Sequence, residues 1–177
     1  VNPALADVDI VVHTAAHVGD WGHADQFRAI NVFALEQMLM EVQRLGQLKR
    51  WVQVSSLGVY AARHHHGTNE TEEPDVEGLD GYTRTKAEAD LVLRRYMREH
   101  QFPAVIVRPG FMYGPGDRHV IPAMVERINN GQMKIVGDGK KQLNNTYVGN
   151  FVDGILLAME KEAALGEIFN MRDERLV

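Results

Sequence analysis

Short, continuous apolar runs alternate along the chain with longer stretches of helical periodicity. Three such runs, residues 8–13 (VDIVVH), 50–54 (RWVQV) and 104–107 (AVIV), are typical of strands buried on both faces of a parallel sheet. Between them, residues 24–45 and 82–100 repeat apolar side chains every three or four positions, which predicts amphipathic helices. The order strand, helix, strand predicts right-handed βαβ units and a doubly wound parallel α/β sheet.

The remainder of the chain continues this pattern. We expect helices near residues 120–130 and 150–161, a strand at 133–136, and a last strand-like run at 166–171. Residues 57–80 are polar and irregular, and a loop of that length inside a compact domain is usually functional or disordered.

Composition argues against several classes of function. The 177 residues include 19 Lys and Arg against 24 Asp and Glu, a formal charge of −5, with no basic stripe, so no nucleic-acid partner is expected. No apolar run is long enough to span a bilayer and no signal-peptide pattern is visible, so we expect no membrane partner and a cytoplasmic location. Without cysteine, neither a disulfide framework nor thiolate chemistry is available.

Polar or turn-forming residues follow each of the three predicted strands. In doubly wound sheets, ligands bind outside the carboxyl ends of the strands, where the loops of neighbouring units meet. That rule selects His13–His17 after the first strand, Ser55 and Ser56 after the second, and Arg108–Phe111 after the third. We therefore expect a ligand site at this edge of the sheet.

Tyr82 and Lys86 lie at the start of a predicted helix, four residues apart and therefore on one face. A free phenol has a pKa of about 10, and a cation ~4 Å away would lower it by up to roughly 3 units, toward working pH. By itself the pair is more simply explained as an ordinary amphipathic helix start. A hydroxyl from Ser55 or Ser56 would complete a set of groups for moving a proton to or from an alcohol oxygen.

Six segments in order carry a family resemblance: HTAAHV, INVFALEQML, VSSLGVY, GYTRTKAEAD, VRPGFMYGPGDR and TYVGNFVDGILLAME. Over residues 8–171 the chain resembles the extended short-chain dehydrogenase/reductases, the NAD-dependent epimerase/dehydratase superfamily, and most closely the 3β-hydroxysteroid dehydrogenase-like branch. The resemblance implies a Rossmann-type sheet and hydride transfer with NAD or NADP. It also implies a catalytic part of the NAD(P)-binding domain over residues 1–118. Residues 119–177 would begin a small substrate-binding portion, with a strand and helix returning to the core.

The same resemblance assigns catalytic roles to four positions. Tyr82 matches the tyrosine that exchanges a proton with the substrate oxygen. Lys86 matches the lysine that holds the nicotinamide ribose and lowers the tyrosine pKa. Ser56 matches the hydroxyl that positions the substrate oxygen, with Ser55 as the alternative, and Asn31 matches a helix asparagine that braces the catalytic helix or a relay water.

Further positions are assigned to cofactor and substrate. The implied cofactor-binding residues are Ala15, Ala16, His17, Ser55, Tyr82, Lys86, Pro109, Gly110, Phe111 and Met112. The candidate substrate residues are Trp21, Tyr60, Asn145 and Tyr147, with Trp21 equally well explained by plain packing.

One departure from the family is expected to matter. Members of this superfamily open with a Gly-rich turn that receives the pyrophosphate, and the only GxG here, Gly137–Gly139, is a turn between two late elements. We therefore expect the chain to be an N-terminally truncated part of a larger enzyme. Three consecutive histidines, His64–His66, cannot easily converge on one ion, so a solvated or substrate-covering loop is favoured and no metal is expected.

Three functions are consistent with these residues. The leading hypothesis is an oxidoreductase that interconverts a secondary alcohol and a ketone, acting on a small hydroxy or keto compound. The second is a nucleotide-sugar epimerase or dehydratase with the same triad, and the third is a non-catalytic dinucleotide-binding protein on the same fold. Relatives often pair through the corresponding helices, so a homodimer through the Tyr82 helix is a further hypothesis.

Overall fold

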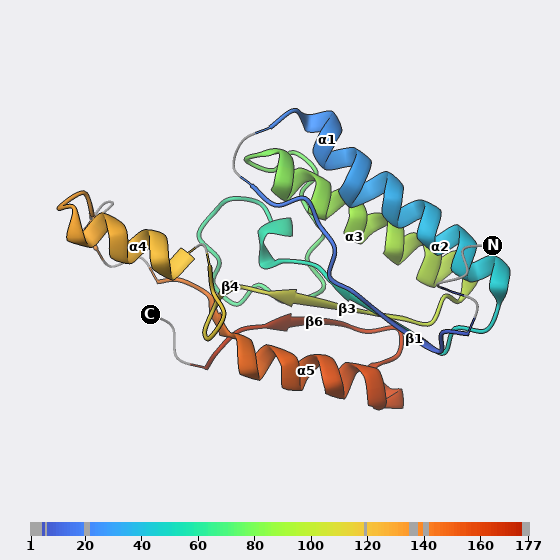
Figure 1. Ribbon diagram of the computed structural model, residues 1–177. Coiled ribbons are helices and arrows are strands. Elements are labelled where there is room, and N and C mark those ends of the chain that lie inside the picture. Colours follow the sequence, from blue (N-terminus) through green and yellow to red (C-terminus); the bar gives the residue numbers. More distant parts are fainter. Residues whose placement is uncertain are drawn as a thin grey trace.

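The computed structural model describes residues 5, 7–19, 22–118, 120–134, 138–139 and 142–174 (Figure 1). Its main sheet has the strand order β1-β2-β3-β6, and every pairing is parallel. The strands are β1 (Ile10–His13), β2 (Arg50–Val54), β3 (Ala104–Pro109) and β6 (Ile168–Met171). The predicted parallel α/β sheet is confirmed, although the first strand begins two residues later than the apolar run suggested.

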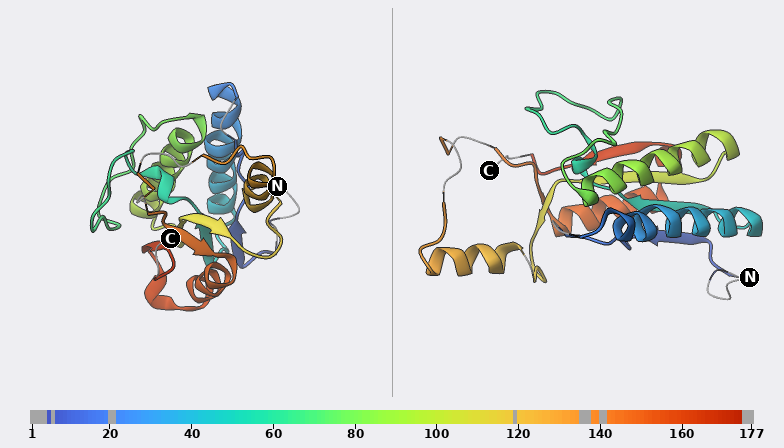
Figure 2. Two further views of the ribbon diagram at one scale, coloured as in Figure 1. Left: turned by 90° about the vertical axis from the view of Figure 1, so that its left-hand side faces the viewer. Right: turned by 90° about the horizontal axis from the view of Figure 1, so that it is seen from above.

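Helices cover both faces of this sheet, as a doubly wound fold requires (Figures 1 and 2). On one face, a continuous rod and a second long helix lie side by side; on the other lies a single helix. The rod consists of α1 (Ala24–Arg28), the π-helical turn η2 (Ala29–Phe33) and α2 (Ala34–Leu45). The second helix is α3 (Gly81–His100), and the helix on the opposite face is α5 (Val148–Glu160).

Alternation along the strands builds the two halves of the core, since successive side chains point to opposite faces. Trp51 and Ile106 pack with Leu39 and Leu93 beneath α2 and α3. Their neighbours Val52, Val105 and Val107 pack with Phe151 of α5. Continuous apolar runs were therefore the correct signature of strands buried on both faces for β2 and β3. For β1 this prediction was wrong, because β1 is an edge strand of this sheet and Ile10 and Val12 are 39% and 37% exposed.

Helix α3 begins, and helix α2 ends, at residues suited to those positions. Asp80 is its N-cap: the carboxylate accepts from the backbone N–H of Thr83 at 2.7 Å, and the Thr83 hydroxyl accepts from the Asp80 N–H at 3.2 Å, which forms a capping box. Gly46 ends α2 in the left-handed conformation, with φ 68°. The Asp80 cap fixes where α3 starts, and so where Tyr82 lies.

The segment beyond β3 was predicted less well. A second, two-stranded parallel sheet joins β4 (Phe111–Tyr113) to β5 (Asn145–Tyr147), and neither strand was expected. Close approach explains Gly110 between β3 and β4, because a Cβ there would lie 1.9 Å from the carbonyl oxygen of Asn144. Helix α4 (Val120–Asn129) projects away from the sheet and buries none of its residues (Figure 2).

The remaining expectations divide between confirmed and untested. The helix near residues 120–130 is confirmed, and the last helix begins at Val148, two residues before its predicted start. Met133 and Lys134 belong to no strand, and the rest of the strand predicted at 133–136 lies outside the described residues. The 57–80 loop is irregular apart from the 3-10 turn η3 (Leu57–Val59), and a second such turn, η4 (Glu162–Ala164), follows α5.

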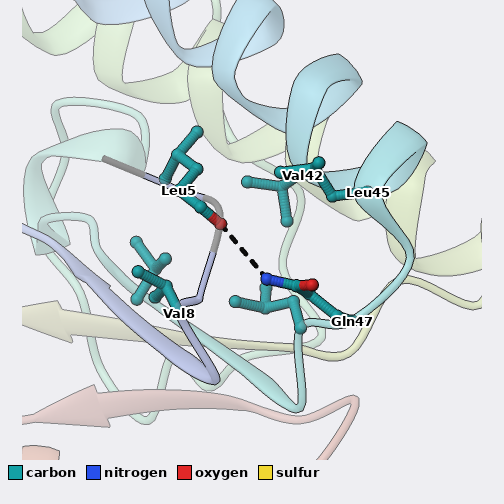
Figure 3. A pocket seen from close by; sticks show the side chains of 7 residues that line it. Leu5, Val8, Val42, Leu45 and Gln47 are labelled. Carbon is teal, nitrogen blue, oxygen red and sulfur yellow. Dashed lines mark hydrogen bonds between the residues drawn. The ribbon is translucent and has the colours of Figure 1, made fainter. Parts of the chain in front are cut away.

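A small apolar pocket lies at the amino ends of the strands, remote from the carboxyl edge (Figure 3). Leu5, Val8, Val42 and Leu45 line it, and the Gln47 amide donates to the Leu5 carbonyl at 3.3 Å. It has no room for a water-sized molecule, so it reflects packing between the first residues and α2.

Candidate functional site

Tyr82 and Ser56 meet at the carboxyl edge of the sheet. Tyr82 is the second residue of α3 and Ser56 follows the end of β2, and the Ser56 hydroxyl lies close enough to the Tyr82 phenol to act on its pKa. The Ser56 hydroxyl also accepts from the backbone N–H of Gly58 at 3.0 Å, which fixes the serine at the start of η3. The structure therefore brings together the tyrosine and one of the two serines that the sequence selected.

Lys86 lies one turn further along α3 and is 4% exposed. Its ammonium donates to the carbonyl oxygen of Val54, the last residue of β2, at 2.6 Å. Burial lowers the pKa of Lys86 to about 8, and the charge of Asp90 opposes that shift. Among the described residues Lys86 has no carboxylate within ion-pair distance, so it is a buried cation held by a backbone carbonyl.

The expected effect of Lys86 on Tyr82 was wrong for this geometry. The pKa of Tyr82 is raised, mainly because burial disfavours the phenolate, with the hydrogen bond from Ser56 acting in the opposite direction and the charge of Asp80 adding to the rise. The Lys86 ammonium points to the Val54 carbonyl and contributes nothing to this shift. Tyr82 is therefore a neutral phenol, ready to donate a proton.

Asn31 braces the site from the π-helical turn. Its side chain accepts from the backbone N–H of His17 at 2.7 Å, donates to the His17 carbonyl at 3.1 Å and donates to the Thr85 hydroxyl at 3.0 Å. The amide thus joins the loop after β1 to α3, and it holds the segment Ala15–His17 beside that helix. The two roles expected for Asn31, bracing the helix or a relay water, stay predictions, and these contacts are the ones that the first role requires.

His13 was part of the selected loop but received no role. It ends β1, is buried, stacks on Trp51 with ring centroids 5.3 Å apart, and its Nδ1 lies 3.2 Å from the Gln53 side-chain oxygen. Burial and the nearby charge of Lys86 lower its pKa. A neutral His13 beside Lys86 adds no second positive charge to the site.

Ser55 and Tyr60 belong to a buried ionic network. The Ser55 hydroxyl donates to Asp90 at 2.8 Å, Asp90 pairs with Arg108 through two hydrogen bonds of 2.7 and 3.0 Å, and Arg108 donates to the Tyr60 hydroxyl at 2.6 Å. The Asp90 and Arg108 side chains are both 0% exposed. Ser55 is thus held inside the core, while Ser56 contacts Tyr82.

Sequence reasoning missed Asp90 and Arg108 as a pair. The available signal was a charged residue at the end of an otherwise apolar strand, because an arginine is rarely fully buried without a partner. Its partner on α3 is one turn beyond Lys86.

The substrate candidates Asn145 and Tyr147 lie on β5 and are organised by Asp173. This carboxylate accepts from the Asn145 amide at 2.9 Å, from the Tyr147 backbone N–H at 3.1 Å and from the Tyr113 hydroxyl at 2.9 Å. Hydrogen bonding, led by the Tyr147 N–H, lowers the pKa of Asp173. Sequence reasoning missed Asp173 because it lies 26 residues from Tyr147 along the chain.

The remaining assigned positions are distributed along the same edge. Pro109 ends β3, and the Gly110 N–H is shared between the Thr146 hydroxyl at 2.9 Å and the Met171 carbonyl at 3.2 Å. Phe111 is 39% exposed, whereas Met112 packs against the α5 side of the core. Trp21 lies outside the described residues. The part of the chain that the structure describes contains no group of three His, Asp or Glu side chains able to hold a metal ion.

No helix among the described residues has both the length and the hydropathy of a bilayer-spanning segment.

The family model for the NAD-dependent epimerase/dehydratase family matches residues 1–171. The chain belongs to this family. Its Rossmann-like parallel sheet is the one that the resemblance led us to expect.

Curated relatives of this chain include a reductase and a dehydrogenase. A 2-alkyl-3-oxoalkanoate reductase of Stenotrophomonas maltophilia is 31% identical over 89% of this chain and 48% of that protein. A sterol-4-alpha-carboxylate 3-dehydrogenase of Candida albicans is 32% identical over 86% of this chain and 44% of that protein. The chain thus spans about half the length of these relatives.

A similar solved structure is the UDP-glucuronic acid 4-epimerase of Bacillus cereus, in complex with UDP-glucuronic acid and NAD. It has a TM-score of 0.85 and 25% identity over 98% of this chain and 57% of that chain. A dTDP-glucose 4,6-dehydratase of Streptomyces venezuelae with NAD bound has a TM-score of 0.85 and 26% identity over 99% of this chain and 55% of that chain.

Proposed function

We propose that this chain supplies the catalytic site of an NAD(P)-dependent oxidoreductase that interconverts a secondary alcohol and a ketone. The observation that carries the proposal is that Ser56 after β2, Tyr82 at the start of α3 and the buried Lys86, bonded to the last residue of β2, lie together at the carboxyl edge of the sheet. In this view residues 1–118 form the catalytic part and residues 119–177 begin the substrate side, where β5 contributes Asn145 and Tyr147.

The donor set around Lys86 fits a nicotinamide dinucleotide. An ammonium has three N–H donors, and in the described part of the chain only the Val54 carbonyl accepts from Lys86, so two donors are available for ribose hydroxyls. The loop Ala15–His17, held by Asn31, lies beside the same helix and would border the cofactor. When bound, such a cofactor supplies or accepts the hydride that no side chain can carry.

The protein's own groups then act on the substrate oxygen. Ser56 donates a hydrogen bond that orients this oxygen, and Tyr82 transfers the proton to or from it. The raised pKa of Tyr82 keeps the phenol protonated, which suits donation of a proton to a ketone oxygen.

A nucleotide-sugar epimerase or dehydratase is the second candidate, and it is supported by the similarity to the epimerase of Bacillus cereus. The same Ser56 and Tyr82 would serve that reaction. We favour the oxidoreductase because the more similar curated relatives are a reductase and a dehydrogenase. Net formation of NADH from added NAD separates the two, because an epimerase returns the hydride to its substrate and accumulates none.

Replacing Tyr82 by phenylalanine tests the proposal. Tyr82→Phe removes the proton donor, so turnover should fall by at least ~10²-fold while the affinity for the dinucleotide is kept. Tyr96→Phe is the matched control, since Tyr96 lies on the same helix and is buried in the core away from the carboxyl edge. Retained turnover in Tyr82→Phe would overturn the proposal.

The homodimer through α3 belongs to the same proposal. Its neighbour, the α1–α2 rod, exposes Ile30, Phe33 and Met40, which a partner helix could cover. Sedimentation analysis of the purified protein gives the oligomeric state, and a monomer at micromolar concentration would exclude this pairing.

A further inference from the structure

A cavity of about 330 Å³ is lined by residues of the segment that follows Ser56. It is bordered by the 57–80 loop, the end of β6 and the segment that leads into β5, and is open to solvent on one side. Its lining includes Tyr60 and His66 from the loop, Gln142 and Asn144 before β5, and Asn170 and Arg172 at the end of β6. Leu57 also lines it, and Leu57 is the residue directly after Ser56.

The described residues that line the cavity include a positively charged side chain and no negatively charged one. The whole chain carries more acidic than basic residues, with a net charge of −5, yet among the described residues no Asp or Glu lines this cavity. Arg172 lines it and brings a guanidinium group to it. Glu70 accepts from the backbone N–H of Asn170 at 2.7 Å but does not line the cavity.

Donors on the lining side chains are left unused. Among the described residues, Arg172 makes a single hydrogen bond, from Nη1 to the Asp173 carbonyl at 3.3 Å, so four of its five N–H groups remain available. The Asn170 side-chain oxygen accepts from the Tyr60 hydroxyl at 2.9 Å, which leaves the Asn170 NH₂ group as its unused end. An excess of donors with one fixed positive charge is suited to an oxyanion.

The buried ionic network makes part of this lining rigid. Tyr60 is held by Arg108, which is fully buried and paired with Asp90, and Tyr60 in turn holds Asn170. His65 is fixed through Ala61 at 2.8 Å and Thr68 at 2.9 Å. The single O–H of Tyr60 is already donated to Asn170, so the donors left for a ligand are the Asn170 NH₂ group, held in place by Tyr60, and the Arg172 guanidinium. Fixing the Asn170 side chain in advance lowers the entropic cost of binding.

We propose that this cavity binds an oxyanion of the substrate, a carboxylate or a phosphate, and so places a nearby carbon at Ser56 and Tyr82. The proposal rests on the proposed function, because it names the substrate class of the same site. The names of two relatives specify a carboxylate or 3-oxoalkanoate substrate, and the similar epimerase structure holds a nucleotide sugar with a diphosphate. Both sources supply the oxyanion chemistry that the cavity fits.

The test compares acids with neutral isosteres in the full protein. Calorimetric titration with 3-hydroxybutyrate and with 3-hydroxybutyramide should show the acid binding about tenfold or more tightly, because a bidentate contact to Arg172 is charge-assisted. Arg172→Gln should reduce that ratio to near one. Arg63→Gln is the matched control. Arg63 lies on the 57–80 loop that borders the cavity, its side chain is 58% exposed, and it pairs with Glu72 outside the cavity.

A third probe, inorganic pyrophosphate, identifies the source of the anion. Tighter binding of pyrophosphate than of the hydroxy acid, lost in Arg172→Gln, supports the proposal with a phosphate-bearing substrate. The reverse order supports it with a carboxylate. Equal affinities for the acid and the amide, or no binding of any anion at millimolar concentration, overturn it.

The two proposals fail separately. In Tyr82→Phe the preference for the acid should be unchanged, since Tyr82 does not line the cavity. Retained turnover in Tyr82→Phe contradicts the oxidoreductase and leaves the Arg172 measurement to be judged by itself. Lost turnover with no preference for the acid supports the oxidoreductase and contradicts the oxyanion site.

Discussion

Helix α3 carries two buried charged side chains one turn apart, and only one of them has a counter-charge among the described residues. Asp90 is fully buried and paired bidentately with Arg108, with a further hydrogen bond from Ser55. Lys86 is also buried, but a backbone carbonyl is its only described partner, and burial lowers its pKa to about 8. A buried charge that is fully paired serves the fold, whereas one that the fold leaves with free donors indicates a ligand site.

The paired region should give the largest effect on stability. Asp90→Asn keeps the shape of the side chain but leaves the Arg108 guanidinium buried without its counter-charge, so unfolding should be easier by about 3–5 kcal/mol. Glu73→Gln is the control, because it breaks an exposed ion pair with Arg94 and should cost at most ~1 kcal/mol. Urea denaturation measures both, and equal losses would mean that the buried pair has no special role.

The topology of the site could be predicted from the sequence because it follows from short-range rules. Helical spacing places Tyr82 and Lys86 on one face, and parallel strands end at one edge, so Ser56 was expected nearby. The direction of the Tyr82 pKa shift could not be predicted, since it depends on burial and on where the Lys86 ammonium points. Nor could spacing decide between Ser55 and Ser56, which lie next to each other just after β2.

The segment after β3 was predicted less completely for a different reason. Strands β4 and β5 are three residues long, too short to show periodicity, and they pair across 34 residues of sequence. Asp173, which organises β5, is a single carboxylate with no local pattern around it. Contacts of this kind depend on tertiary packing.

The adjacent residues Ser55 and Ser56 allow the same comparison, between a residue that stabilises the buried ion pair and a residue at the proposed site. Ser56→Ala removes the hydroxyl that contacts Tyr82, so turnover should fall by about 10²–10³-fold with little change in stability. Ser55→Ala leaves Asp90 short of one hydrogen bond, so it should cost about 1–3 kcal/mol of stability with turnover nearly unchanged. Steady-state kinetics and urea denaturation of both variants check this, and swapped outcomes would show that the catalytic hydroxyl is Ser55.

Lys86 should give opposite pH dependences for stability and for turnover. Its pKa is lowered from 10.5 to about 8 in the folded protein, so between these values the unfolded state binds more protons and stability rises with pH. Below pH 8 both states hold the proton, and the full cost of the buried charge, up to about 3 kcal/mol, is present. Turnover needs the ammonium donors, so it should fall as pH rises through about 8.

The variant Lys86→Met isolates this effect, because it removes the titrating group while the helix and the neighbouring Tyr82 remain. Tyr82 titrates in both proteins, so subtracting the two stability curves cancels its contribution. The stability of the natural protein relative to Lys86→Met should therefore increase from pH 8 to pH 10.5 and be flat below pH 8. A difference that is flat throughout would show that Lys86 is solvated, and the contrast between the two buried charges of α3 would then not hold.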